Sequence, residues 1–152
     1  MDKEERVDKW SSATFRITSL TLSTAEIMEA LDTPPSRAWE RGSPVSLRNP
    51  DGPRRDVSIW TFDSDLSDTE PLDAHIMRLI EFIERRLDAL KALQSCCDFD
   101  ICCAFASGNG QGGFTLESGT LLRLTLLPID LIVSLYPPEA RETKDDHDAA
   151  VS

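Results

Sequence analysis

Residues 71–96 read PLDAHIMRLIEFIERRLDALKALQSC and form the one long periodic stretch of the chain. Apolar side chains recur there every three or four residues, the spacing that places them on one side of an α-helix. They are Leu72, Ile76, Leu79, Ile80, Ile83, Leu87, Leu90 and Leu93. Pro71 suits a first helical turn, where its missing N–H costs no hydrogen bond. The pattern predicts one amphipathic helix over residues 71–96, and the rest of the chain must supply the surface that its apolar side covers.

The chain before this helix predicts strands and one shorter helix. Residues 13–22 alternate in the way of a first strand. Ser23 and Glu26 form a capping box, and Leu22 and Ile27 stand where a hydrophobic staple needs them, so a helix is expected from Ser23 to the stop at Pro34. A short strand at residues 38–41, a long loop, a strand at residues 57–63 and an acidic connector at residues 63–70 complete this half.

The chain after the helix predicts two strands around a short helix. Residues 99–106 read as a buried strand, and the glycines of residues 108–113 break it. Residues 114–117 briefly continue a strand pattern. A short helix at residues 121–127 stops at Pro128, and a strand follows at residues 129–136.

This order predicts a single α+β domain at residues 13–138. Its form is a two-layer sandwich, with a mostly antiparallel sheet that carries the long helix 71–96 and the shorter helices on one face. Residues 1–12 and the acidic residues 139–152 lack apolar periodicity and are expected to be flexible tails.

Composition limits the function classes. The 152 residues include 27 acidic and 16 basic side chains, a formal net charge of -11. Such a chain is repelled by phosphate backbones and anionic lipids, which disfavours nucleic acid and membrane surfaces as partners. The start lacks the pattern of a signal peptide, and no apolar run could cross a bilayer, so a cytoplasmic location is expected. The four cysteines are then expected to be reduced thiols.

Several short motifs resemble the bacterial domain-of-unknown-function family 4279. They are Phe15-Arg16-Ile17, the helix of residues 23–31, Pro35-Ser36-Arg37-Ala38-Trp39 with Gly42, Trp60, Leu72 with His75, Gly112-Gly113-Phe114, and Tyr136-Pro137. The resemblance covers residues 14–137 and implies a compact α+β domain without established catalytic residues or ligand. Some similar domains resemble immunity proteins of toxin systems, which is an association and not a mechanism.

The sharpest local contrast is an arginine-rich island in an acidic chain. Arginine beside tryptophan can bind phosphate or carboxylate while the ring stacks on a base or a partner side chain. The alternative is that both tryptophans are core residues and that nearby acids neutralise the arginines. The candidate binding residues are Arg37, Trp39, Arg41, Arg54, Arg55, Trp60 and, on the central helix, His75, with Arg48 a further member of the island.

Other chemistry-bearing residues form no complete constellation. His75 lacks a recognisable nucleophile or acid partner, so a satisfied histidine at the surface or domain boundary is preferred over a general base. Cys102 and Cys103 point to opposite faces of a strand, so four thiolates cannot easily converge on zinc, and buried free cysteines or a redox switch are expected instead. The glycine-rich residues 108–113 lack the Lys-Ser or Lys-Thr of a phosphate loop and read as a turn.

These observations favour a non-catalytic protein-binding domain without metal or cofactor, most concretely an immunity-type inhibitor or accessory protein of a toxin or defence system. Negative charge would steer a basic partner to it, and Trp39 would be the buried anchor. The alternative is a small-ligand or nucleotide-binding domain that uses the arginine-rich loop. An enzyme built on His75 is a third hypothesis.

Overall fold

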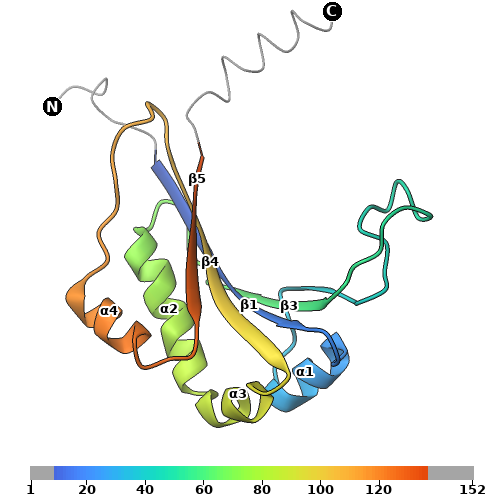
Figure 1. Ribbon diagram of the computed structural model, residues 1–152. Coiled ribbons are helices and arrows are strands. Elements are labelled where there is room, and N and C mark those ends of the chain that lie inside the picture. Colours follow the sequence, from blue (N-terminus) through green and yellow to red (C-terminus); the bar gives the residue numbers. More distant parts are fainter. Residues whose placement is uncertain (1–8, 137–152) are drawn as a thin grey trace, which may run out of the picture.

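Five strands form one sheet in the order β2-β3-β1-β4-β5 in the computed structural model, which describes residues 9–136 (Figure 1). Strand β1 pairs antiparallel with β3 and β4, and β2 pairs antiparallel with β3, whereas β5 runs parallel to β4. The sheet is therefore mixed. In chain order the elements are β1 (Lys9–Ser19), α1 (Thr24–Leu31), β2 (Arg37–Trp39), β3 (Ser58–Asp63), α2 (Leu72–Glu84), α3 (Leu87–Leu93), β4 (Cys97–Ser107), α4 (Ser118–Leu124) and β5 (Asp130–Tyr136).

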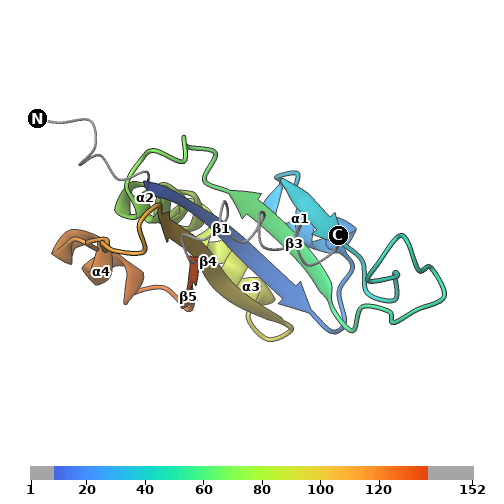
Figure 2. The same cartoon turned by 90° about the horizontal axis from the view of Figure 1, so that it is seen from above.

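The α+β class is confirmed, and the core lies between the sheet and the helices. Alternate residues of β1, such as Phe15 and Ile17, are fully buried, as is Ile101 of β4. Helix α2 contacts both strands, and Figure 2 shows α1, α2 and α3 behind the sheet, with α4 beside it. The opposite side of the sheet, called the open face below, carries the intervening side chains, including the half-buried Thr14 and Arg16.

Aromatic rings fill the centre of the core. Phe82 of α2 stacks on Phe62 of β3 with ring centroids 3.8 Å apart, and it also lies 6.4 Å from Trp60 and 6.2 Å from Phe15. Phe15 in turn stacks on Phe99 of β4. Because offset and tilted aromatic pairs add to the free energy of area burial, these rings fix how α2 sits on the sheet.

The prediction of one helix over residues 71–96 is wrong, because the segment forms two helices, α2 and α3. The helical hydrogen bonding ends at Arg85 and Arg86, where the Arg86 amide bonds the Ile83 carbonyl at 3.0 Å and its φ of -121° leaves the helical region. The Arg86 guanidinium donates to Thr33 Oγ1 at 3.0 Å, just beyond α1, and lies over the Phe82 ring. A contact with a distant part of the chain therefore holds the break.

Other boundaries also differ from the sequence prediction. Strand β1 begins at Lys9, so residues 9–12 pair with β4 instead of belonging to a tail, because β4 extends to Ser107 and supplies partners for them. Residues 114–117 form no strand, and α4 starts at Ser118, three residues before the expected start. The remaining expected tail residues, 1–8 and 139–152, lie outside the described residues, as do residues 137 and 138.

The start of α1 is confirmed in detail. Ser23 Oγ accepts from the Glu26 amide at 3.1 Å, which is the N-cap bond of a capping box, and the Ser23 hydroxyl also lies 3.2 Å from the Glu26 carboxylate, to which it donates. Within residues 9–136, none of the helices has the length and apolar character that crossing a bilayer requires.

Candidate functional site

Strands β2 and β3 bring three residues of the arginine-rich island together on the open face. Arg37 and Trp39 alternate along β2 and so share a side of the sheet. Arg55 reaches them from the loop, which is tied back by hydrogen bonds from the Arg55 amide to the Ser43 carbonyl at 2.9 Å and from the Gly42 amide to the Arg55 carbonyl at 2.8 Å. The guanidinium carbons of Arg37 and Arg55 lie 5.7 and 5.3 Å from the Trp39 ring centroid, within cation–π range. We call these three residues the Trp39 cluster.

The Trp39 cluster lines a cavity of about 340 Å³ on the open face. Its other walls come from three strands: Thr14 and Arg16 of β1, Ile59 and Thr61 of β3, and Cys102 of β4. Arg16 forms a two-pronged ion pair with Asp100, with N–O distances of 2.8 and 2.9 Å. The Arg16 guanidinium is thus paired with a carboxylate at short distance, whereas Arg37 and Arg55 have longer contacts.

Two features leave the Trp39 cluster with spare hydrogen-bond donors. Arg37 is well exposed and reaches Asp63 only at 3.4 Å. Arg55 lies 3.4 Å from the Val45 carbonyl through one terminal nitrogen, and its buried Nε has no acceptor among residues 9–136. The terminal nitrogens of Arg37 and Arg55 thus make only long contacts, so a carboxylate, phosphate or carbonyl oxygen that enters the cavity would be stabilised by accepting hydrogen bonds from them.

The other predicted arginines do not line this cavity. Arg41 donates to the Leu20 carbonyl, and Arg54 donates to the Gly42 carbonyl at 2.8 Å. Both therefore hold the backbone of the long loop. Arg48 is exposed in the same loop.

Trp60, a predicted binding residue, does not line this cavity. Its side chain is fully buried beneath α2, on the side of β3 opposite to Ile59, and it packs edge-on against Phe15 and parallel to Phe62. Alternation along residues 57–63 predicts that the strand has two faces but does not say which face the helices cover. In the structure, the face with Trp60 and Phe62 packs into the core.

His75 is buried and not at the surface, contrary to the expectation. Its Nδ1 lies 2.6 Å from the Ser64 hydroxyl oxygen, and its Nε2 has no partner among the described residues. Burial lowers the pKa of His75 below its ordinary value of 6.5. The carbonyls of Ser67 and Glu70 and the carboxylates of Glu70 and Asp68 favour the protonated ring, but their effect on the pKa is smaller than that of burial. The contact joins the acidic connector to α2, and a hydroxyl only 3% exposed is poorly placed to attack a substrate.

The four cysteines are split between two surroundings. Cys103 is buried in the core and Cys102 lies on the open face, as the alternation of a strand predicts. Cys96 and Cys97 have sulfur atoms 4.0 Å apart. Burial raises the pKa of Cys97 and Cys102 to about 11 and that of Cys103 to about 12, so these thiols are protonated and weakly nucleophilic at neutral pH.

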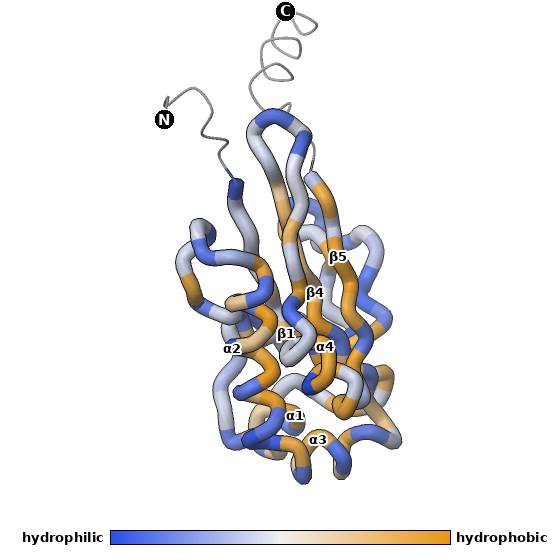
Figure 3. The backbone as a smooth tube through the Cα atoms, turned by 90° about the vertical axis from the view of Figure 1, so that its left-hand side faces the viewer, coloured by the Kyte–Doolittle hydropathy of each residue, from blue (hydrophilic) through white to orange (hydrophobic). Residues whose placement is uncertain are grey.

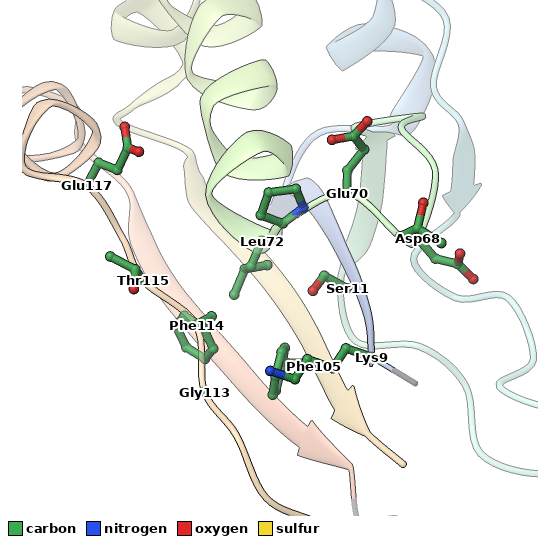
Figure 4. A pocket seen from close by; sticks show the side chains of 12 residues that line it. Lys9, Ser11, Asp68, Glu70, Leu72, Phe105, Gly113, Phe114, Thr115 and Glu117 are labelled. Atoms are coloured by element: carbon green, nitrogen blue, oxygen red, sulfur yellow. The ribbon is translucent and has the colours of Figure 1, made fainter. Parts of the chain in front are cut away.

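A second hollow of about 450 Å³ was missed by sequence reasoning. It lies where the start of β1, the acidic connector and residues 113–117 meet, and Figure 4 shows Phe105 and Phe114 on its floor, their ring centroids 5.4 Å apart. Carboxylates of Asp68, Glu70 and Glu117 surround it. Residues 108–113 make the turn that leads to it, as expected. No sequence signal joins these segments, because they meet only through the sheet.

The comparisons with known proteins identify a family and no relative of known activity. The model of the family DUF4279, described as a domain of unknown function, matches residues 8–138. No curated protein matches the chain, and no solved structure does. The match spans every described helix and strand, including β2 and β3 with the Trp39 cluster.

Proposed function

The chain belongs to the DUF4279 family, a family of unknown function, and from this premise we propose that it is a non-catalytic, cytoplasmic protein-binding domain that contacts its partner through the Trp39 cluster. The proposal uses the expected two-layer arrangement, in which the helices cover one side of the sheet and leave the open face for binding. The observation that carries it is the pair of guanidinium groups beside the half-exposed Trp39 ring, which reach Asp63 and the Val45 carbonyl only at 3.4 Å.

The chemistry of the cluster defines what the partner must offer. Trp39 presents an aromatic surface, and the guanidinium groups of Arg37 and Arg55 lie against its ring. Tryptophan and arginine are among the side chains that contribute most to binding energy at interfaces. The partner therefore inserts an apolar or planar group against Trp39 and a carboxylate or carbonyl oxygen toward Arg37 and Arg55.

Charge away from the cluster favours a partner that is basic overall. The net charge is -11, and the acidic connector exposes Asp65, Asp68 and Glu70. Such a field accelerates the encounter with a basic protein more than it raises the affinity. In the most concrete form of the proposal, the partner is a toxin-like protein and the domain is its immunity-type inhibitor or an accessory protein of a defence system.

The test identifies a partner and then locates its binding site. The tagged protein captures the partner from its native cells, and the dissociation constant is measured with both proteins purified. Trp39→Ala and Arg55→Ala are expected to weaken binding by about tenfold or more, the loss typical of an interface hot spot. Arg48→Ala is the matched control, because it removes one arginine of the same loop outside the cavity. Unchanged affinity in folded Trp39→Ala and Arg55→Ala proteins contradicts the proposal.

A small anionic ligand is the second candidate, because the cavity is within the size range of ligand sites and is lined by Arg37 and Arg55. A ligand that binds only the native state raises the midpoint of thermal unfolding. Inorganic phosphate, nucleotides and aromatic carboxylates are expected to raise it in the wild-type protein and not in Arg55→Ala. A flat response to all of them contradicts this candidate without affecting the protein-binding proposal.

A further inference from the structure

Strand β5 forms an edge of the sheet that lacks the usual protection against pairing. It pairs with β4 on one side only, and no described residue hydrogen-bonds to its outer backbone groups. Natural edge strands are protected by charges, prolines or bulges. Strand β5 contains no proline, and its only charged side chain is Asp130 at its start.

The exposed side chains of β5 are apolar on both faces. Leu135 is 70% exposed and Val133 37% exposed on the helix side, while Ile132 and Tyr136 are about half exposed on the open face. Figure 3 shows β5 as a hydrophobic stretch beside α4. Helix α4 adds the exposed Leu121 and Leu122, and the turn between α4 and β5 adds the exposed Leu126.

The strand sequence fits a second copy of itself. In antiparallel pairing about a two-fold axis at Val133, Leu131 of one copy lies opposite Leu135 of the other, and both point to the helix side. On the open face, Asp130 lies opposite Tyr136, whose hydroxyl can donate to the carboxylate. The two Asp130 residues are then six residues apart along the strands, about 20 Å, so their repulsion is screened.

Charge and the rest of the chain argue against other occupants. A basic partner finds only Asp130 to pair with on this strand. The largest aliphatic side chain in residues 139–152 is a single valine, so these residues offer little to cover the six exposed leucine, isoleucine and valine side chains of this surface. We propose that two copies of this chain associate through their β5 edges, extending the five-stranded sheet to ten strands with a Trp39 cluster on each half.

The first test measures the oligomeric state by sedimentation at increasing protein concentration. A species of twice the monomer mass is expected, and because each copy carries a charge of -11, the dimer is expected to tighten when salt rises from about 50 to 500 mM. Leu135→Lys is expected to weaken the dimer by at least about tenfold, since it places a charge opposite Leu131. Leu47→Lys, at a leucine 93% exposed in the long loop, is the matched control and leaves it unchanged.

The second test fixes the register. Val133→Cys places a thiol on the two-fold axis, where paired strands bring Cα atoms within disulfide range. Oxidised glutathione is expected to convert this variant to a covalent dimer, while Asp130→Cys and the wild-type protein stay monomeric on a non-reducing gel. A monomer at all concentrations, or cross-linking of Asp130→Cys in place of Val133→Cys, overturns the proposal.

Discussion

Acidification is expected to weaken the fold through His75. The His75 side chain is only 1% exposed, and its Nδ1 is hydrogen-bonded to the Ser64 hydroxyl. Burial holds the pKa of His75 below its ordinary value of 6.5. Because the unfolded chain takes up a proton near pH 6.5 and the native ring does so only at lower pH, protons bind preferentially to the unfolded state between these two values. The contribution is complete above pH 6.5 and is lost as the pH falls toward the native pKa.

The magnitude follows from the proton count. One proton taken up by the unfolded state alone changes the free energy of unfolding by about 1.4 kcal/mol per pH unit, which is the steepest slope that His75 can impose. The Glu84 carboxylate, whose pKa is lowered by its hydrogen bond to Arg123, adds its own loss only near and below its ordinary 4.5. The window just below pH 6.5 therefore reports on His75.

The assay is urea unfolding between pH 5 and 7.5. His75→Asn replaces Nδ1 by an amide that can still bond Ser64 but does not titrate, so its stability is expected to be flat across the upper part of this range. His147→Asn is the control, because His147 is the other histidine of the chain and lies outside the described residues. Equal slopes of stability against pH in the wild-type and His75→Asn proteins would contradict this role of His75.

Three further predictions concern the core, the thiols and the first helix. Phe82→Ala is expected to lower the free energy of unfolding by about 3–5 kcal/mol in chemical denaturation, because it removes the ring at the centre of the aromatic core, and Phe114→Ala to lower it much less. At pH 7.5, Cys97 is expected to react with iodoacetamide about 100-fold more slowly than an ordinary thiol until the chain is unfolded, and equal rates contradict the raised pKa. Ser23→Ala is expected to cost about 0.5–2 kcal/mol in thermal unfolding, whereas an unchanged midpoint contradicts the capping role.

Periodicity predicted the types of the main elements well, because β1, β4 and α2 each bury one side. It did not predict the helix break at Arg85 and Arg86, because the apolar spacing of α2 continues without interruption to Leu87 and Leu90. The break depends on Arg86 reaching Thr33 beyond α1. A hydrogen bond between residues 53 positions apart does not affect the local apolar pattern, so the sequence alone could not locate the helix break.

The sequence indicated that arginine and tryptophan would form the candidate site, but it did not show which of these residues would come together. The island indicated that Arg37, Trp39 and Arg55 could act together, and β2 and the returning loop do bring them together. Which arginines would instead bond backbone carbonyls, and which tryptophan would be buried, depends on the side of β3 that α2 covers. That choice is made by packing of the whole sheet and not by the residues of the island.

Hydrogen–deuterium exchange with the captured partner tests the binding site most directly. Slower exchange is expected in β2 and in the long loop that carries Arg55 when the partner is bound. No such protection is expected in a complex with the Trp39→Ala variant at the same concentrations. Protection confined to the acidic connector or to α4, with β2 and the loop unchanged, would contradict the assignment of the Trp39 cluster as the contact surface.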